Sequence, residues 1–529
     1  MKNSMRLCAA GALLALAACG TDSTTSAVST STARGTLVDN PPIRIASVDA
    51  ATLAAQLGAS ASGKQLLQIT GAPACGVDFH YMHYWTVGGA NETASASGAL
   101  MIPTGAAPAC SGPRPILLYA HGTSADKLMN IADITDPNNS EGALLAAMFA
   151  AQGYIVVAPN YTGYDTSNLP YHPYLNAVAQ SSDMIDALVA ARSALGKVLA
   201  SSTTDNGRLF ITGYSQGGYV AMATHRAMQA AKMPVTASAP MSGPYALEAF
   251  ADFVFTGHVD LGSTEFTPLL TTSYQKSYAN VYKATTDAFE AGYAPTIEGL
   301  LPSVTPIATI IGSGQLPQLE LFNSLTPGAG APSTRNPTLD AYLAEPSLNP
   351  ADPTTALYRL GFGTKTATDP GNLVNNTFRA QYVGDALLNP DGALVPNPTV
   401  PLPAAAPLVP FRQDLKLNDL RGWSPMAPVL MCGGSQDPVV FFKVNTGVMA
   451  ALWGALIPLH VVTVLDLETA PTATDPFGAL EGAFQATKTA IFTAAGGGAA
   501  GQSAVVQAYH TAEVPFCSAA ARGFFASIP

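Results

Sequence analysis

The feature that most constrains the fold of this chain is a serine flanked by glycines. An apolar run precedes this serine, and an Ala-rich stretch follows it. The segment Gly213-Tyr214-Ser215-Gln216-Gly217-Gly218 occurs once, directly after the apolar residues Leu209-Phe210-Ile211. This pattern predicts a sharp turn from a buried strand into a helix. The turn exposes the serine hydroxyl, and the small residues Gly213 and Gly217 let the backbone fold that tightly. Ser215 is therefore the candidate nucleophile.

From about Pro113 onward, short apolar runs alternate with longer Ala-rich stretches, which predicts an α/β fold. Continuous apolar runs are typical of strands buried on both faces, as in a mostly parallel central sheet. The runs predicted as such strands are Ile116–Ala120, Tyr154–Ala158, Leu209–Thr212, Val429–Cys432 and Leu459–Leu465. The predicted helices are Leu144–Gln152, Ser182–Leu199 and Gln216–Lys232. Alternating residues within Leu66–Met101 predict antiparallel edge strands that lead into this sheet.

The alternation of strands and helices stops between residues 242 and 420, where Pro-rich and Gly-rich segments separate short helical pieces. We therefore divide the body of the chain into a first core segment, 66–241, an insertion, 242–420, and a second core segment, 421–529. The insertion is predicted as mainly helical or irregular, and its apolar content fits a cap over an active site. A separate domain of unrelated function is the alternative interpretation.

Asp437 is the candidate acid that orients a catalytic base. It closes the turn after the predicted strand Val429–Cys432, and a buried strand delivers a carboxylate well at its C-terminal edge. Where a serine turn of this kind is catalytic, the acid and the base follow the serine along the chain, with the base last. The competing acidic residues lie before this strand or after the next one and are Asp419, Asp466 and Glu468.

Two histidines lie downstream of Asp437, and His510 is the candidate base. It precedes the predicted helical segment Ala519–Phe525, so we expect it in a loop. His460 falls inside an apolar run and is interpreted as a core residue. The other histidines outside the serine site receive no chemical role and are His80, His83, His172, His225 and His258.

An oxyanion site needs two backbone N–H donors, one directly after the nucleophile and one from the loop after an early strand. Gln216 supplies the first donor. For the second, the predicted strand Ile116–Ala120 runs into a His-Gly turn, and Thr123 is the candidate donor with Gly122 as the fallback. His121 is interpreted as a structural histidine that holds this loop.

The charge balance excludes several classes of partner. Hydrophobic residues make up 48% of the chain and charged residues 11%, and 24 basic against 35 acidic residues give a net charge of -11. A composition of this kind favours a well-packed body, and without a basic cluster it argues against binding to nucleic acids or anionic headgroups. No Cys or His spacing is typical of a metal site, so we expect neither metal nor cofactor.

The N-terminus is typical of a bacterial lipoprotein. Lys2 and Arg6 precede the apolar run Leu7–Ala18, and Cys19 follows it, so residues 1–18 are predicted as a signal peptide. Cys19 is then the lipidated residue, and the Ser-rich and Thr-rich residues 19–45 form a tether to a membrane. This predicts an exported envelope protein, in the outer membrane because Gly20 follows Cys19. The alternative is an ordinary secretory signal containing a chance cysteine, and thus a secreted protein.

Four cysteines remain in the body of the chain and, in an exported protein, suggest two disulfides. Three pairings are possible, and we favour Cys75 with Cys110 and Cys432 with Cys517. The first two flank an early strand region. The second pair would tie the segment carrying Asp437 to the segment carrying the candidate base.

Several segments together resemble a known family. They are Tyr119-Ala120-His121-Gly122-Thr123, Ala158-Pro159-Asn160-Tyr161-Thr162-Gly163-Tyr164, His172-Pro173-Tyr174-Leu175, the Ser215 segment and Asp437-Pro438-Val439. They resemble the secretory lipases of fungal lipase-A type and related bacterial α/β-hydrolase lipoproteins. The resemblance implies an α/β-hydrolase fold, ester hydrolysis under a mobile cap, and a catalytic triad of Ser215, Asp437 and His510. The family often has Asp where this chain has Asn160.

The sequence therefore predicts a carboxylic ester hydrolase, an esterase or lipase acting on small-molecule, lipid or polyester substrates through an acyl-enzyme. His510 would remove the Ser215 proton while Asp437 orients the imidazole. We expect a monomer. Two alternatives remain open: an exported serine peptidase with the same triad, and a non-catalytic envelope lipoprotein.

Overall fold

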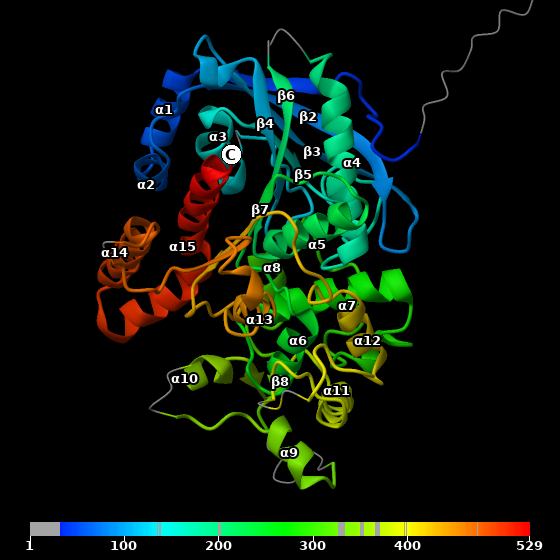
Figure 1. Ribbon diagram of the computed structural model, residues 1–529. Helices are drawn as coiled ribbons and strands as arrows, with labels where there is room; N and C mark the ends of the chain where they lie inside the picture. The colour runs from blue at the N-terminus through cyan, green and yellow to red at the C-terminus, as the bar shows by residue number, and fades with distance from the viewer. Residues whose placement is uncertain are drawn as a thin grey trace, which may run out of the picture. The chain divides into compact units, whose positions relative to one another are not determined.

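A nine-stranded sheet forms the core of this computed structural model, which describes residues 32–134, 136, 139–198, 203–325, 334–349, 354–364, 371–395, 397, 399–472 and 474–529 (Figure 1). The strand order across the sheet is β1-β2-β3-β5-β4-β6-β7-β10-β11. The bounds are β1 (Ile43–Val48), β2 (Gly76–Val87), β3 (Thr93–Thr104), β4 (Pro113–Ala120), β5 (Ile155–Pro159), β6 (Thr204–Tyr214), β7 (Ala237–Met241), β10 (Val429–Gly433) and β11 (Val462–Asp466).

The sheet changes from antiparallel to parallel at β5. The pairs β1–β2, β2–β3 and β3–β5 are antiparallel. From β5 through β4, β6, β7 and β10 to β11, every pairing is parallel. Because parallel strands end at the same edge, the segments that follow β4, β6 and β10 meet at one edge of the sheet. The mostly parallel sheet confirms the predicted fold class.

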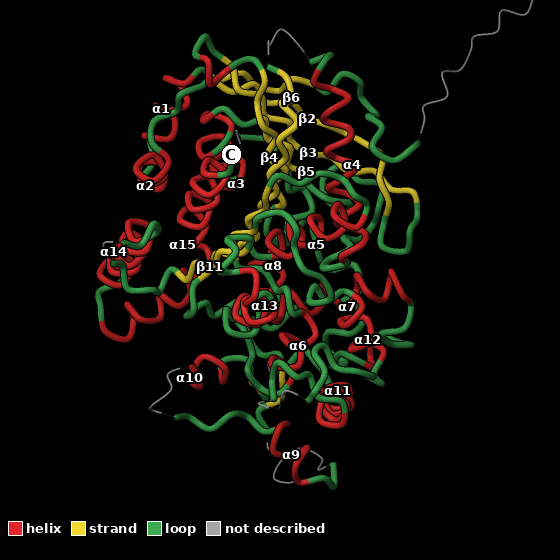
Figure 2. Tube along the Cα trace, viewed as in Figure 1, coloured by secondary structure: helices red, strands yellow, loops and turns green. Residues whose placement is uncertain are grey.

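Helices cover both faces of this sheet (Figure 2). Successive side chains of β4 point to opposite faces, so Ile116 and Leu118 join one buried cluster and Leu117 and Tyr119 join the other. The helices α4 and α5 pack in the first cluster, and α1, α2, α3 and α15 pack in the second. Their bounds are α1 (Ala50–Gly58), α2 (Ala61–Thr70), α3 (Ser140–Met148), α4 (Ala177–Leu195), α5 (Gln216–Ala230) and α15 (Gly498–Ser527).

Between β7 and β10 the chain forms mainly short helices, which lie together in the lower half of Figure 1. They are α6 (Leu247–Phe255), α7 (Ser263–Tyr278), α8 (Ile307–Gly312), α9 (Pro337–Leu343), α10 (Thr354–Arg359), α11 (Asn376–Leu388) and α12 (Pro410–Leu417). Two short strands, β8 (Phe322–Asn323) and β9 (Phe362–Gly363), pair in parallel within this insertion. After β10, the helices α13 (Thr446–Leu452) and α14 (Gly478–Ala494) precede α15.

Buried ion pairs fasten parts of the insertion to one another. Arg412 of α12 is fully buried and lies within 2.7 Å of Asp252, 3.3 Å of Glu248 and 3.3 Å of Asp385. An arginine in such a site must remain paired, because an uncompensated buried charge costs several kcal/mol. These contacts hold α6, α11 and α12 together.

The N-terminal part of the body differs from its predicted elements. Leu66–Thr70 belongs to helix α2 and not to a strand, although β2 and β3 do form the predicted antiparallel hairpin. The stretch predicted as a tether up to residue 45 already includes the start of β1, which pairs with β2. The predicted signal peptide, 1–18, the lipidated Cys19 and the tether up to residue 31 lie outside the described residues.

The segment around His460 was also predicted wrongly. The last strand begins at Val462 instead of Leu459, and His460 is an exposed residue of the preceding turn with a φ of 57°. His460 is therefore not a core residue, because it belongs to the exposed turn that joins α13 to β11.

Residues 32–529 form one compact unit. Within the described part of the chain, no helix has the length and apolar character needed to cross a membrane.

Candidate active site

Ser215 lies on a sharp turn between β6 and α5. It is buried, and its backbone has φ 59° and ψ -123°, a combination that a non-glycine residue rarely adopts. The Ser215 N–H donates to the carbonyl of Met241 on the neighbouring strand, 3.0 Å away. The flanking elements therefore hold the strained residue in place, and its hydroxyl lies beside the first turn of a helix.

The glycines of this turn are required by close backbone contacts. A Cβ atom on Gly213 would lie 2.3 Å from the carbonyl oxygen of Gly217 and 2.5 Å from that of Ala120. A Cβ atom on Gly217 would lie 2.0 Å from the Ala120 oxygen. Neither position leaves room for a side chain, so both residues allow the end of β4 to approach Ser215.

His510 and Asp437 complete a chain of hydrogen bonds with the serine. His510 Nε2 lies 2.9 Å from Ser215 Oγ, and His510 Nδ1 lies 2.7 Å from Asp437 Oδ2. All three residues are buried. The structure thus brings together the three residues predicted as a triad, from segments up to 295 positions apart.

The expectation that His510 lies in a loop is wrong, because this residue belongs to the long helix α15. Pro515 stands five positions later, where proline removes one helical N–H donor. The helix nevertheless continues through Pro515. Tyr214 of β6 holds His510 in place, because its hydroxyl donates to the backbone carbonyl of His510 and the two rings lie 4.7 Å apart.

The Asp437 carboxylate is oriented by the turn that follows β10. Its Oδ1 accepts from the backbone N–H groups of Val439 and Val440 at 2.9 and 3.2 Å, which leaves Oδ2 for the histidine. The competing acids have other partners. Asp419 pairs with Arg421, Asp466 accepts from the backbone N–H groups of Ser435 and Glu468, and Glu468 pairs with Lys488.

The predicted oxyanion donors both lie next to Ser215. Gln216 is the first residue of α5, where backbone N–H groups need no helical acceptor. Gly122 and Thr123 follow β4 and, with Ser215 and His510, line one cavity. The Gly122 N–H already donates to Glu141 Oε1 at 3.2 Å, whereas within the described residues the Thr123 N–H has no acceptor. This difference favours Thr123 over the fallback.

His121 and His172 are structural histidines of this region. His121 lies between the carbonyls of Gly122 and Asn160. His172 accepts a hydrogen bond at Nε2 from the side chain of Gln216, 2.7 Å away, and burial lowers its pKa to about 3. Burial lowers the pKa of His121 as well. The sequence placed His172 in a loop without a chemical role, and only the structure shows its contact with Gln216, the predicted oxyanion donor.

Two cavities meet at Ser215, and the insertion supplies much of the wall of the smaller one. The smaller, of about 70 Å³, is mainly apolar and reaches between α6 and α7. The larger, of about 790 Å³, extends from His510 toward α1, α2 and α3. Phe266 of α7 lines both, as Ser215 does. The buried Asp260 lines the small cavity, and burial raises its pKa to about 7.

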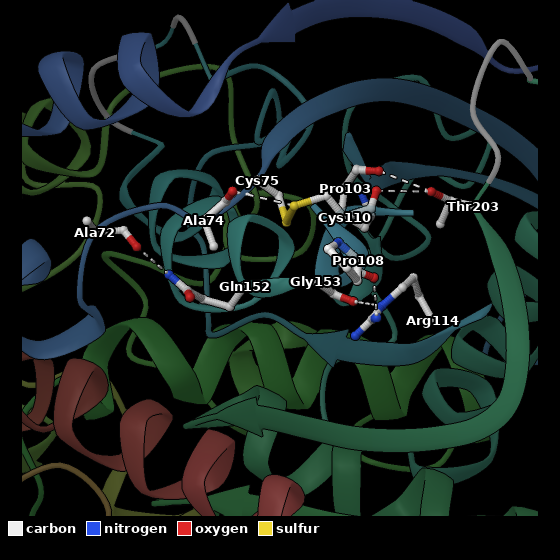
Figure 3. Close-up of a disulfide and its surroundings, with 10 residues drawn as sticks. All are labelled: Ala72, Ala74, Cys75, Pro103, Pro108, Cys110, Arg114, Gln152, Gly153 and Thr203. Atoms are coloured by element: carbon white, nitrogen blue, oxygen red, sulfur yellow. Dashed lines mark hydrogen bonds between the residues drawn. A yellow bond between two sulfur atoms is a disulfide. The ribbon is translucent and has the colours of Figure 1, made fainter. Parts of the chain in front are cut away.

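The structure contains both predicted disulfides, Cys75–Cys110 and Cys432–Cys517. The first lies far along the chain from the triad, where Arg114 donates to the carbonyls of Gly153 and Pro108 (Figure 3). The second joins β10, which leads to Asp437, to α15, which carries His510. Disulfides of this kind are typical of proteins that fold in an oxidising compartment, and they indicate export.

A comparison with protein families matches the part of the chain that carries Ser215. The model of the prolyl oligopeptidase family of peptidases matches residues 143–287, which contain Ser215. No protein in a curated collection matches the chain. The family match covers Ser215 and its neighbouring helices and supports a serine hydrolase.

Solved structures match over much more of the chain. The rice cell wall degrading esterase LipA of Xanthomonas oryzae is 25% identical over 93% of this chain and 99% of that one, with a TM-score of 0.63. A mutant of the same esterase is 27% identical over 82% and 91%, with a TM-score of 0.60. Candida antarctica lipase A reaches 12% identity over 82% and 75% and a TM-score of 0.40, too weak to bear on this chain. The chain has an α/β-hydrolase fold, and its neighbours support a serine hydrolase.

Proposed function

We propose that this chain is an exported carboxylic ester hydrolase, an esterase or lipase, that forms an acyl-enzyme on Ser215. The observation that carries the proposal is the directed chain of hydrogen bonds from Ser215 through His510 to Asp437. With Asp437 accepting from Nδ1–H, the lone pair of Nε2 points at the serine hydroxyl. His510 can therefore remove the proton from Ser215 as the hydroxyl attacks an ester carbonyl.

The mechanism uses groups of this chain and water. Attack by Ser215 Oγ gives a tetrahedral intermediate whose oxyanion accepts from the N–H groups of Gln216 and Thr123. His510 then returns its proton to the departing alcohol, and an acyl group remains on the serine. A water molecule, deprotonated by His510, attacks the acyl-enzyme and releases the acid. Asp437 stays ionised and stabilises the imidazolium in both halves.

The two cavities suggest how an ester is placed. The apolar cavity of about 70 Å³ suits the acyl part, since a cavity of about 150 Å³ holds one benzene ring. The larger cavity of about 790 Å³ suits the alcohol part. We infer a preference for acyl chains of a few carbons and tolerance of bulky alcohols, including polyesters. The similarity to LipA supports this inference, because LipA is named a cell wall degrading esterase.

An exported serine peptidase is the second candidate, and the match to the prolyl oligopeptidase family favours it. The same triad could attack an amide, so hydrogen bonds alone do not separate the two. A panel of p-nitrophenyl esters from acetyl to palmitoyl, a polyester film and aminoacyl anilides will distinguish them. We expect ester turnover to exceed anilide turnover by at least about a hundredfold, and the reverse order would establish the peptidase.

The nucleophile is tested with a fluorophosphonate probe, which labels activated serines. Ser215→Ala is expected to abolish both labelling and ester hydrolysis while the unfolding temperature stays near that of the wild type. Ser124→Ala is the matched control, because among the described residues the Ser124 hydroxyl bonds only to the backbone of Asp126, donating to its carbonyl and accepting from its N–H. Labelling that persists in Ser215→Ala would exclude this site, and an unlabelled wild type would favour the non-catalytic lipoprotein.

We also propose that the mature chain is tethered to a membrane by a lipid on Cys19. The proposal rests on the apolar run that ends at this cysteine. Metabolic labelling with a radioactive fatty acid should mark the wild type and not Cys19→Ser, and the variant should then appear in the medium. A wild type without label would identify an ordinary secretory signal.

A further inference from the structure

Glu513 is a fully buried carboxyl group directly behind the proposed triad. It lies three positions after His510 on α15, so one face of the helix presents both side chains. A carboxylate oxygen of Glu513, an oxygen of Asp437 and a ring nitrogen of His510 all lie within 4.8 Å of one another. Two carboxyl groups therefore share one small buried space beside the base.

The two carboxyl groups differ in their hydrogen bonds. Asp437 accepts three: two from backbone N–H groups and one from His510. Glu513 accepts one, from the Ser242 hydroxyl at 2.5 Å to Oε2, and its buried Oε1 has no partner within the described residues. Hydrogen bonds to a carboxylate favour its ionised form. When two adjacent acids share a proton, the one with fewer donors keeps it, and here that is Glu513.

The charges around Glu513 also favour its protonated, neutral form. Asp437 from the turn after β10 faces it, as do Asp466 and Glu468 from the end of β11, while Tyr214 of β6 and Tyr509 of α15 add uncharged hydroxyls. Lys488 of α14, a cation near these acids, is paired with Glu468. Within the described residues no ion pair involves Glu513. Burial, followed by repulsion from Asp437, raises the pKa of Glu513 well above its ordinary value.

We propose that Glu513 is a positioning residue of the triad, a neutral carboxylic acid that fills the space behind Asp437 and leaves Asp437 as the single negative charge beside His510. The proposal deepens the proposed function and rests on the Ser215–His510–Asp437 triad. A second ionised carboxylate here would compete with Asp437 for the proton and loosen its bond to His510. A neutral acid keeps the space dry and polar without that competition.

The first test measures the rate at which the fluorophosphonate probe labels Ser215, per folded molecule, between pH 5 and pH 9. Glu513→Ala opens a space behind Asp437 and should slow labelling about tenfold. Glu513→Gln has the shape of the neutral acid and should restore most of that rate. The labelling rate should fall toward acidic pH, and the pH at which it reaches half its maximum should agree between Glu513→Gln and the wild type within about 0.3 pH units.

Two results would overturn the proposal. If Glu513 were ionised, removing a charge this close to the imidazole would lower the midpoint in Glu513→Gln by about one pH unit or more. If Glu513→Ala labelled as fast as the wild type, the side chain would have no positioning role. Labelling reports on Ser215 alone, so these outcomes stand whether the natural substrate is an ester or a peptide. A Ser215 that no probe labels in the wild type would instead refute the proposed function.

A second measurement, the pH dependence of the unfolding temperature, tests the proposal even if Glu513→Ala folds too poorly to be labelled. A buried acid with a raised pKa keeps its proton in the folded state at pH values where the unfolded chain has released it, so wild-type stability falls as pH rises above about 4.5. Glu513→Gln has no such proton. Its unfolding temperature minus that of the wild type should therefore become more positive between pH 5 and pH 8, by about 3 °C. A difference independent of pH would show that Glu513 is ionised.

Discussion

The Cys432–Cys517 disulfide offers the sharpest test of how the candidate site is held together. It joins the strand that leads to Asp437 with the helix that carries His510, and both sulfurs are buried. The Cys75–Cys110 disulfide has no such role and serves as a matched control. We compare two double variants: Cys432→Ala with Cys517→Ala, and Cys75→Ala with Cys110→Ala.

Loop length sets the expected loss of stability. The cysteines are separated by 85 positions in the site disulfide and by 35 in the control. Release of loops of these lengths in the unfolded chain predicts losses of about 4.6 and about 3.8 kcal/mol at 25 °C. Urea unfolding without reductant measures both. The two losses are similar, so any large difference in activity must come from local geometry.

Activity should separate the two variants. Without the site disulfide, β10 and α15 can move relative to each other, and a shift of about 1 Å between base and nucleophile is enough to lower kcat/KM about a hundredfold. We expect a fall of at least tenfold in the site variant and less than twofold in the control, both measured well below the unfolding midpoint. Equal losses of activity would refute this reasoning and show that the disulfide acts through overall stability alone.

Three further substitutions test other parts of the structure. Gly217→Ala should abolish ester hydrolysis and lower the unfolding temperature, since its Cβ would lie 2.0 Å from the Ala120 oxygen; a normally active variant would contradict the turn geometry. Phe266→Ala should join the two cavities and move the optimum of the p-nitrophenyl ester panel toward longer acyl chains, and an unchanged optimum would count against the assigned acyl cavity. Arg412→Met should cost about 3–5 kcal/mol in urea unfolding because three buried carboxylates lose their cation, whereas Lys416→Met in the same helix removes only a hydrogen bond to the Ala405 carbonyl and should cost about 1 kcal/mol.

The parts of the fold that the sequence could predict are those encoded by local patterns. The Leu209–Thr212 run lies in β6 and the following Ala-rich segment is α5, because a continuous apolar run and helical periodicity each need only neighbouring residues. β7 was missed, since Ala237–Met241 contains Ala, Ser and Pro and no bulky β-branched residue. Its burial in the centre of the sheet is decided by the strands on either side.

The parts that could not be predicted depend on contacts between distant segments. His510 was placed in a loop because the predicted helical segment began only at Ala519, whereas α15 begins at Gly498 and continues through Pro515 as it packs on the sheet. Glu513 gave no signal at all, because its spacing from His510 has meaning only once both are known to be helical. The same holds for His172, whose contact with Gln216 joins segments 44 positions apart.

In the proposed function, the residues that carry the chemistry and those that select the ester lie in separate segments of the chain. The three residues of the candidate triad lie on turns and a helix that belong to the sheet and its covering layer, outside the 242–420 insertion. Phe266 and most of the apolar lining of the small cavity lie on α6 and α7, inside it. Substitutions in α6 and α7 can therefore reshape the acyl cavity while the hydrogen bonds of Ser215, His510 and Asp437 persist. Because those hydrogen bonds depend instead on β10, α15 and their disulfide, a loss of reactivity toward the fluorophosphonate probe points to that part of the structure, and a change of preferred ester points to the insertion.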